Sequence, residues 1–429
     1  MNILVLGSGG REHTLAWKIS QSFNCSHLFV APGNAGTELV ADNVDIQVND
    51  FEAIGEFVKE NEIELLVVGP EDPLVNGIRD YFEADDQLKA TRIVGPGKVG
   101  AQLEGSKDFS KTFMQKHGIP TAESKTFTKE TIKEGLAYLE TCQLPIVLKA
   151  DGLAAGKGVV IAQNIDEAKT TLNAMLIDKA FGEASSKVLV EQFLDGIELS
   201  VFVLTDGTDY IILPEAKDYK RIGEGDTGLN TGGMGAVSPV KFADQAFMTK
   251  VNEKVIKPTV AGLKTDGIDY KGFIFIGLMN VDGEPFVIEY NVRMGDPETQ
   301  VVIPRIQSDI VDMLWAAAEG TLKDYELVVS GSTVVGVVLV SGGYPGSYEK
   351  GKSIQGLADI TNTMVMHAGT KQDDYQVLTN GGRVLTIIGS GDELNDALNI
   401  VYKEINYISW QDMYYRKDIG KDILAARVF

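Results

Sequence analysis

The stretch Val147-Leu148-Lys149-Ala150-Asp151-Gly152-Leu153-Ala154-Ala155-Gly156-Lys157-Gly158-Val159-Val160 determines how the chain is organised. One apolar run predicts a buried strand that ends at Lys149, and a second apolar run begins at Val159. Between them, three glycines in residues 152–158 let the backbone approach a ligand closely. Free backbone N–H groups and two lysines favour an anion, so we expect a flexible cover over a polyphosphate. An ordinary glycine-rich hairpin is the alternative.

This stretch differs from a P-loop in its spacing. A P-loop has four residues between its first glycine and the Gly-Lys pair, and Ser or Thr follows the lysine. Here three residues separate Gly152 from Gly156, and Gly158 follows Lys157. The sequence therefore predicts a different kind of nucleotide-phosphate site.

Length, charge and cysteine content limit the function classes. A chain of 429 residues is long enough for about three domains. Its net charge of −22 argues against nucleic acid or an anionic membrane as a partner. Cys25 and Cys142 have neither disulfide-framework nor zinc-site spacing. The N-terminal residues lack a basic leader region, and no apolar run approaches the ~18 residues of a membrane span. We expect a cytoplasmic protein that acts on small molecules.

The first hundred residues alternate apolar strands with helices, which predicts a mostly parallel, Rossmann-like sheet. Strands are expected near residues 2–6, 28–31, 64–68 and 92–94. Ligands of such sheets bind at the carboxyl ends of the strands. The turns at 7–13 and 69–74 both follow strands, so they should line one crevice.

The first turn, Gly7-Ser8-Gly9-Gly10-Arg11-Glu12-His13, lacks the third glycine of the dinucleotide fingerprint, because Glu12 stands there. A helix N-terminus with Arg11 and His13 in its first turn suits a single phosphate group. The alternative is that both side chains are solvated.

Farther along, a helix is expected over residues 99–117, and the first domain boundary lies near its end. A small unit follows to about residue 190. Residues 220–235 hold six glycines without periodicity, which predicts a long functional loop. A hairpin is expected over 272–292 with an Asp282-Gly283 turn, and the last unit, from about 327, carries strands near 332–340, 364–367 and 383–388.

The second strand of that hairpin carries a polar pattern, Glu289-x-Asn291-x-Arg293. Residues two apart in a strand share a face. A carboxylate and an amide oxygen are hard ligands for Mg²⁺ held together with nucleotide phosphates. Arg293 would stabilise a transferring phosphoryl group. The alternative is a half-polar strand with a solvated face.

An adenosine site is expected where the strand near 188–191 ends. Glu191 could accept a hydrogen bond from the adenine amino group, and Glu198 could bind the ribose hydroxyls. A sheet edge with exposed acids is the alternative.

In this order, these features resemble the ATP-grasp superfamily of carboxylate–amine ligases and, more closely, the phosphoribosylamine–glycine ligase family. The resemblance covers essentially the whole chain and rests on these motifs: residues 7–13, Gly69-Pro70-Glu71, Leu103-Glu104-Gly105-Ser106-Lys107, 149–159, 225–235, 291–300, Gly343-Tyr344-Pro345-Gly346, His367-Ala368-Gly369-Thr370 and Asn380-Gly381-Gly382-Arg383.

The resemblance implies an α/β enzyme of four units. These are a Rossmann-like N-terminal domain (1–102), a small ATP-grasp lid with its linking helix (103–190), a central ATP-grasp subdomain (191–326) and a small α+β, barrel-like C-terminal domain (327–429). It implies an ADP-forming ligase of purine biosynthesis that joins glycine to 5-phospho-β-D-ribosylamine through glycyl phosphate. The expected cofactors are ATP and Mg²⁺ or Mn²⁺, and the expected form is a monomer or weak homodimer.

The resemblance also implies a site, with Arg293 and Lys149 as catalytic residues and Glu289 and Asn291 as metal ligands. The expected ATP-binding residues are Lys107, Lys149, Gly152, Gly156, Lys157, Gly158, Glu191, Leu194 and Glu198. The expected substrate-binding residues are Gly9, Gly10, Arg11, Glu12, Pro70, Glu71, Asp218, Arg221, Asn230, Thr231, Gly232, Gly233, Arg293, Gly295, Asp296, Pro297 and Glu298.

Two departures from the family pattern matter. Lys217-Asp218-Tyr219-Lys220-Arg221 stands where the family usually has Gln-Asp-His-Lys-Arg. The first hairpin strand offers no acid, so the metal shell would be completed by phosphates and water. One alternative function is another ATP-grasp ligase of purine metabolism, such as a formyl-phosphate-using enzyme, although the motifs at 7–13 and 296–300 argue against it. The other is a non-catalytic nucleotide sensor, which should lack Arg293 or Glu289.

Overall fold

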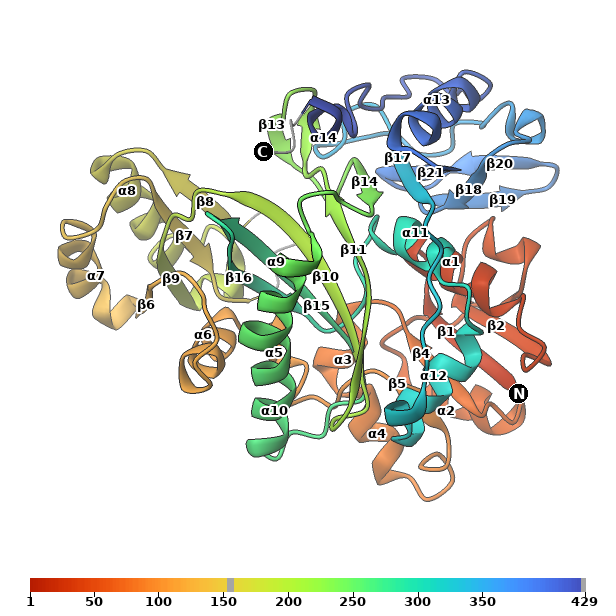
Figure 1. Cartoon of the computed structure of the whole chain (residues 1–429), viewed down its shortest axis with the longest axis horizontal. Helices are drawn as coiled ribbons and strands as arrows, with labels where there is room; N and C mark the ends of the chain where they lie inside the picture. Colours follow the sequence, from red (N-terminus) through yellow and green to blue (C-terminus); the bar gives the residue numbers. More distant parts are fainter. Residues whose placement is uncertain (153–157, 426–429) are drawn as a thin grey trace.

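Five parallel strands form the N-terminal sheet, in the order β3-β2-β1-β4-β5 (Figure 1). The structure, a computed structural model, describes residues 1–152 and 158–425. The strands are β1 Asn2–Gly7, β2 His27–Pro32, β3 Asp42–Asn43, β4 Leu65–Val68 and β5 Arg92–Val94. The helices are α1 Gly10–Ile19, α2 Phe51–Glu60, α3 Glu71–Asn76 and α4 Ile78–Ala84. Leu6 of β1 pairs in parallel with Val68 of β4, so the turns after these strands share one edge, as predicted.

The helix expected over residues 99–117 is two helices, α5 Gln102–Gly105 and α6 Lys107–Lys116. The prediction of one helix is wrong because Ser106 has extended backbone and its hydroxyl accepts a hydrogen bond from the Phe109 N–H. This is a helix N-cap, and it places Lys107 in the first turn of α6.

A small antiparallel sheet follows, in the order β6-β9-β7-β8. Its strands are β6 Ser124–Thr128, β7 Ile146–Ala150, β8 Val159–Ala162 and β9 Lys187–Gln192, with helices α7 Ile132–Leu139 and α8 Ile165–Leu176. Lys149 pairs with Val159 across β7 and β8, which confirms the two strands predicted on either side of the glycine-rich stretch.

An eight-stranded sheet in the order β16-β15-β10-β11-β14-β17-β21-β18 spans the remaining chain. Its strands are β10 Ile197–Thr205, β11 Tyr210–Asp218, β14 Gly235–Ser238, β15 Gly272–Val281, β16 Glu284–Asn291, β17 Thr333–Val340, β18 Met364–His367 and β21 Arg383–Gly391. The C-terminal strands therefore continue the central sheet, because β14 pairs antiparallel with β17.

Helices and short elements complete the fold. The helices are α9 Gln245–Val251, a π-helical turn η4 Asn252–Ile256, α10 Lys257–Thr265, α11 Thr299–Val302, α12 Ile310–Glu319, α13 Leu394–Ile405 and α14 Lys421–Ala425. The 3-10 helices are η1 Thr37–Leu39, η2 Lys129–Thr131, η3 Gly182–Ser186, η5 Ile303–Arg305, η6 Leu322–Asp324 and η7 Leu357–Asp359. A further hairpin is β19 Thr370–Asp373 and β20 Gln376–Thr379.

The segment 220–235 is more regular than expected. It contains a small hairpin, β12 Arg221–Gly223 and β13 Thr227–Asn230. Positive φ angles at Gly225 (66°) and Asp226 (53°) reverse the chain between the two strands. The absence of periodicity did not reveal this hairpin, because strands this short are set by their turn.

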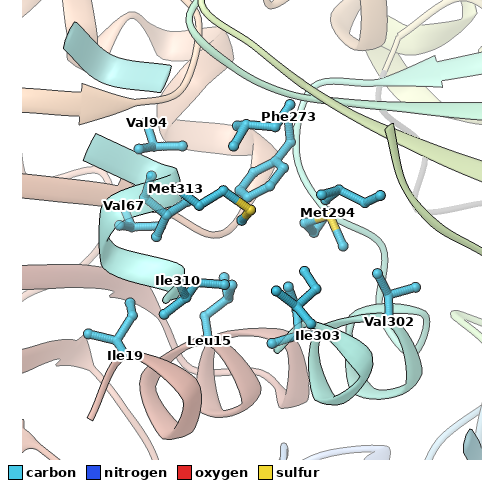
Figure 2. Close-up of a cluster of buried hydrophobic side chains, with 14 of the residues drawn as sticks. Leu15, Ile19, Val67, Val94, Phe273, Met294, Val302, Ile303, Ile310 and Met313 are labelled. Atoms are coloured by element: carbon cyan, nitrogen blue, oxygen red, sulfur yellow. The ribbon is translucent and has the colours of Figure 1, made fainter. Parts of the chain in front are cut away.

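A buried core beneath the predicted crevice joins the N-terminal sheet to the segment that follows β16 (Figure 2). Leu15 and Ile19 of α1 and Val67 of β4 belong to the same cluster as Met294 and Ile303. This packing holds the loop after β16 over the carboxyl ends of β1 and β4. Among the described residues, no helix is long and apolar enough to cross a membrane.

Candidate active site

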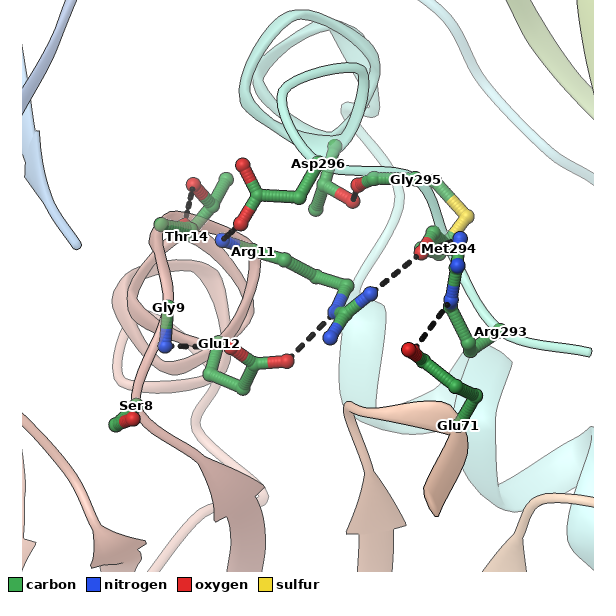
Figure 3. Close-up of polar contacts among 12 residues, drawn as sticks. Ser8, Gly9, Arg11, Glu12, Thr14, Glu71, Arg293, Met294, Gly295 and Asp296 are labelled. Atoms are coloured by element: carbon green, nitrogen blue, oxygen red, sulfur yellow. Dashed lines mark hydrogen bonds and ion pairs between the residues drawn. The ribbon is translucent and has the colours of Figure 1, made fainter. Parts of the chain in front are cut away.

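The turn into α1 is bonded to the loop after β16 (Figure 3). The Gly9 N–H donates to Glu12 Oε2 at 2.7 Å, and Glu12 Oε1 accepts from Arg11 Nε at 2.6 Å. The Arg11 guanidinium also donates to the Met294 carbonyl at 3.1 Å, and its backbone N–H donates to Asp296 Oδ2 at 3.1 Å. Carboxylates thus occupy the helix N-terminal donors that sequence reasoning assigned to a phosphate group.

Arg11 and His13 are not solvated helix residues, so that alternative is wrong. Their exposed fractions are 8% and 4%. His13 Nδ1 accepts a hydrogen bond from the His367 backbone N–H at 2.8 Å, and burial together with the charge of His367 lowers the His13 pKa to about 3. The His13 ring is therefore neutral and joins α1 to β18, whereas sequence reasoning grouped it with a phosphate site.

The second turn contacts the first, so the two turns lie together at one edge of the sheet, as predicted. A side chain at Gly69 would place its Cβ 2.2 Å from Glu12 Oε1, so only glycine fits there. Pro70 has extended backbone and α3 begins directly at Glu71, earlier than expected. Glu71 Oε2 lies 3.2 Å from Arg293 Nε. Although burial opposes its charge, Arg293 and Arg11 hold the pKa of Glu71 below its usual value.

Arg293 is held by a second carboxylate, Glu104, which lies in a motif of the family but for which the sequence predicted no role. Its Nη2 donates to Glu104 Oε1 at 2.6 Å, while Glu104 Oε2 accepts the Val292 N–H at 2.8 Å. Burial raises the pKa of Glu104 to about 7, despite the opposing charge of Arg293. The position of Glu104 three residues before Lys107 was the available signal.

The loop 295–298 contacts both the N-terminal and C-terminal strands. The Gln300 amide donates to Asp296 Oδ1 at 2.8 Å and lies where a Cβ of Gly10 would stand. Arg383 Nη1 donates to the carbonyls of Asp296 and Gly232 at 2.5 and 2.7 Å. Although burial opposes it, Arg383 and Arg11 lower the pKa of Asp296. Arg383 is a second residue to which sequence reasoning gave no role.

Close packing fixes the neighbouring loop residues. Gly233 has a φ of +121°, and a Cβ there would lie 2.4 Å from Pro297 Cδ. A Cβ on Gly295 would lie 2.3 Å from Glu298 Oε2. Glu298 is 4% exposed, and burial together with the charge of Asp218 raises its pKa to about 8. Ser200, whose hydroxyl lies 3.5 Å from Glu298 Oε1, lines the same pocket as Asp218, so Glu298 lies next to that pocket.

The predicted nucleotide residues form a second group. Lys149 Nζ lies 2.8 Å from Glu191 Oε2, and Lys111 Nζ lies 3.5 Å from Glu191 Oε1. Lys107 Nζ donates to the carbonyl of Gly152 at 3.1 Å. Sequence reasoning missed Lys111, although it lies one helical turn after Lys107 on α6. Burial lowers the pKa of Lys111 to about 8.

A small pocket between these groups is strongly charged. Glu198, Asp218, Lys220 and Glu289 are among its lining residues. Lys220 Nζ lies 2.7 Å from Glu198 Oε2. Although burial opposes the charge of Lys220, the carboxylates of Asp218, Glu198 and Glu289 raise its pKa well above the usual value. The alternative of a sheet edge with exposed acids is therefore wrong for Glu191, which is buried, whereas Glu198 and Glu289 are partly exposed and line this pocket.

Glu289 and Asn291 are the predicted metal ligands. Tyr290 and Val292, on the opposite face, are buried in the core, as strand alternation predicted. Within residues 1–152 and 158–425, no three His, Cys, Asp or Glu side chains form a preformed metal cluster. The carboxylate of Glu289 and the amide of Asn291 are oxygen donors of the type that fits a hard divalent cation shared with phosphates.

Some predicted residues lie outside these groups. Gly156 and Lys157 fall outside the described residues, whereas the Gly158 carbonyl accepts the Ala150 N–H at 2.8 Å at the base of the stretch. Leu194 is half-buried in the loop after β9. Arg221 pairs with Asn230 across the β12–β13 hairpin, and Thr231 donates to the Lys220 carbonyl at 2.8 Å.

Comparisons with known proteins agree with this architecture. The phosphoribosylglycinamide synthetase N domain, ATP-grasp (A) domain and C domain match residues 1–104, 105–299 and 334–422. The phosphoribosylamine–glycine ligases of Vibrio parahaemolyticus and Pseudomonas aeruginosa are 45% and 46% identical over 430 residues, with 99% of each chain covered.

Solved structures give the same result. The crystal structure of phosphoribosylamine–glycine ligase from Thermotoga maritima is 33% identical, has a TM-score of 0.85, and covers 97% of this chain and 100% of its own. A biotin carboxylase domain from Hydrogenobacter thermophilus, in complex with MgADP and bicarbonate, has a TM-score of 0.71 over 96% of this chain and 91% of its own. At 17% identity that likeness shows the ATP-grasp fold alone. Given the match of all three domain models in order and relatives that share nearly half of its residues from end to end, this chain belongs to the phosphoribosylamine–glycine ligase family.

Proposed function

We propose that this enzyme joins glycine to 5-phospho-β-D-ribosylamine, giving glycinamide ribonucleotide, ADP and phosphate in the second step of de novo purine biosynthesis. The observation that carries the proposal is the position of Arg293. It lies after β16, between Glu71 of the N-terminal unit and Glu104 of α5, and follows the Glu289–Asn291 pair by two residues.

The first step is proposed to form glycyl phosphate. Glycine is a zwitterion, so its carboxylate requires a cation and its ammonium group requires carboxylates. Arg293 supplies the cation, Asp218 supplies a carboxylate, and a carboxyl oxygen of Glu298 accepts a hydrogen bond from the ammonium group. A glycine carboxylate oxygen then attacks the γ-phosphorus of ATP, and the bond from that phosphorus to the ADP oxygen breaks.

Lys107 and Lys149 are proposed to hold the ATP phosphates, and Glu191 and Glu198 to bind the adenosine. The backbone of Leu194 is proposed to contact the adenine. Lys149 has a carboxylate partner, Glu191, and Lys107 has a carbonyl partner, Gly152. ATP must replace those partners. Mg²⁺ or Mn²⁺ held by Glu289 and Asn291 would neutralise the charge that develops on the phosphates.

The second step is attack of the ribosylamine nitrogen on the glycyl carbonyl carbon. The C–N bond forms, the C–O bond to phosphate breaks, and phosphate leaves with the former glycine oxygen. The attacking amine loses one proton, and the departing phosphate takes it up and leaves as hydrogen phosphate. Developing negative charge on the acyl phosphate is stabilised by the fixed positive charge of Arg293.

The phosphate of the ribosylamine is assigned to the crevice at 7–13, which lies in the N-terminal unit away from the nucleotide residues. Arg11 is the cation of that turn, and it would have to exchange Glu12 or the Met294 carbonyl for the ligand. The hairpin residues Arg221 and Asn230, and the loop 231–233, would complete the substrate side.

A panel of carboxylates tests the function. Purified enzyme with ATP and Mg²⁺ is incubated with glycine, alanine, formate or bicarbonate, with and without phosphoribosylamine, and ADP is measured. Only glycine with the amine should sustain ADP release. Turnover with formate or bicarbonate instead would favour another ATP-grasp ligase of purine metabolism.

A further inference from the structure

A cluster of side chains on the face of β11 opposite to Asp218 connects this strand to the C-terminal segment. Lys217 Nζ lies 2.8 Å from Asp422 Oδ2, and the Tyr219 hydroxyl donates to Asp422 Oδ1 at 2.5 Å. The Gly420 N–H donates to the same hydroxyl at 3.0 Å. We call Lys217, Tyr219 and Asp422 the anchor cluster.

The anchor cluster is tightly packed. Tyr219 is 2% exposed and belongs to the C-terminal core. The Lys217 ammonium lies 4.0 Å from the centre of its ring, and the Arg416 guanidinium lies 5.3 Å from it, so two cations face one aromatic ring. Burial and the bond to Asp422 raise the pKa of Tyr219, so the hydroxyl remains a donor.

Asp218 lies between the two anchoring residues and points the other way. Alternate residues of a strand face opposite sides. Lys217 and Tyr219 contact Asp422, whereas Asp218 lines the charged pocket with Glu198 and Glu289. The position of the Asp218 carboxylate therefore depends on two neighbours that are tied to the C-terminal segment.

The same C-terminal segment holds the adjacent hairpin (Figure 1). Arg416 donates to the Arg221 carbonyl at 3.1 Å and to Asp226 Oδ1 at 2.6 Å. The Gly225 N–H donates to Asp418 Oδ2 at 2.8 Å. The figure shows α14 beside β13, in agreement with these bonds.

We propose that Lys217, Tyr219 and Asp422 are positioning residues, through which the C-terminal segment sets the place of the Asp218 carboxylate for glycine. The inference rests on the proposed function, in which Asp218 binds the glycine ammonium group. Lys217 and Tyr219 are the two positions where the chain departs from the Gln-Asp-His-Lys-Arg pattern of the family. A glutamine at position 217 would have no charge to pair with Asp422, so the ion pair depends on the lysine.

The test is a kinetic comparison of full-length variants. Asp422→Asn removes the charge at a side chain that is 48% exposed, so this variant should fold. Tyr219→Phe keeps the ring and removes the hydroxyl. The control is Glu393→Gln, which removes an exposed carboxylate 3.6 Å from Lys241. For each, kcat, the KM values for glycine and ATP, and the Tm are measured.

Misplacement of a substrate-binding group by about 1 Å can lower a rate about a hundredfold, so we expect kcat/KM for glycine to fall about tenfold or more in both anchor variants. The KM for ATP should change by less than about twofold, because the displaced group binds glycine and the lysines that hold the ATP phosphates stay in place. A general loss of folding or activity would not separate the two substrates in this way. The control should match the wild type. A lower Tm with an unchanged KM for glycine would reduce the cluster to a structural role and overturn the proposal.

A double-mutant cycle adds a test that folding alone would not satisfy. In the background of Lys217→Gln with Tyr219→Phe, which removes both side-chain partners of Asp422 in the anchor cluster, Asp422→Asn should no longer affect the KM for glycine. An equal effect in both backgrounds would contradict the proposal. If the wild type itself releases no ADP with glycine and the amine, the proposed function fails rather than the anchor.

Discussion

Replacing Glu191 by Gln tests how the nucleotide residues are held before ATP binds. Glu191 is 5% exposed and lies 2.8 Å from Lys149 and 3.5 Å from Lys111, whose exposed fractions are 7% and 5%. Although burial opposes its charge, Lys149 and Lys111 keep the pKa of Glu191 below its usual value. Its folded-state pKa is depressed, so the stabilisation is present at neutral pH and is lost as the pH falls through that pKa.

The magnitude follows from burial. Removing one partner of a buried ion pair costs about 3–5 kcal/mol, because the other charge is left uncompensated. An unfolding entropy of about 2.1 cal/mol/K per residue gives ~1 °C per kcal/mol for a chain of 429 residues. At pH 7.5, without nucleotide, the Tm of Glu191→Gln should therefore fall by about 3–5 °C.

Differential scanning calorimetry with and without ATP measures both consequences. The matched control is Glu140→Gln, which removes a half-exposed carboxylate from its ion pair with Lys169 in the same unit, and a surface pair contributes only about 0–1 kcal/mol. ATP should raise the Tm of Glu191→Gln more than that of the wild type, because its phosphates supply the charge that Lys149 has lost, while the glutamine oxygen can still accept a hydrogen bond from the adenine amino group. A Tm equal to that of the control, or equal ATP shifts in both proteins, would refute the reasoning.

Three other perturbations address the remaining parts of the site. Glu289→Gln should abolish ADP release at saturating Mg²⁺ while leaving the Tm near that of the wild type, since a neutral amide binds the cation poorly; a near-normal kcat would remove Glu289 from the metal site. Arg11→Ala should lower kcat/KM for phosphoribosylamine by about ten- to a hundredfold and change the KM values for ATP and glycine little. A larger effect on the KM for ATP than on kcat/KM for phosphoribosylamine would show that the ligand assigned to that crevice is wrong. Glu298 has a pKa raised from 4.5 to about 8, so the folded enzyme retains a proton there and loses stability as the pH rises across that range. The Tm gain of Glu298→Gln should therefore be larger at pH 8 than at pH 5, and equal Tm changes at the two pH values would contradict this.

Local patterns predicted the elements that carry the site. The parallel N-terminal sheet, the strands on either side of 150–158 and the hairpin around Asp282 follow from apolar periodicity and turn residues, and all three are present. The same patterns did not predict that β17 would extend the central sheet through β14, because strand order depends on long-range pairing. They also missed the break between α5 and α6 at Ser106, where the side chain caps the second helix although the apolar pattern continues through both.

The partners of the site residues were harder to predict than their identity. Glu104 and Arg383 stood in quoted motifs, yet their contacts with Arg293 and Asp296 cross between units that are far apart in the sequence. The only sequence signal for Lys111 was its position one helical turn after Lys107. Arg11 was predicted as a phosphate ligand, and the sequence did not indicate that its guanidinium would also bond to Glu12 and to the Met294 carbonyl.

Isotope transfer tests the central claim, the glycyl phosphate intermediate, most directly. Glycine labelled with ¹⁸O in its carboxylate is incubated with enzyme, ATP, Mg²⁺ and phosphoribosylamine, and the inorganic phosphate is analysed by mass spectrometry. Because a glycine oxygen forms the bond to the γ-phosphorus and leaves with it, one ¹⁸O atom should appear in each phosphate released, alongside ADP. Phosphate without ¹⁸O, or ¹⁸O in AMP alongside pyrophosphate, would contradict the account.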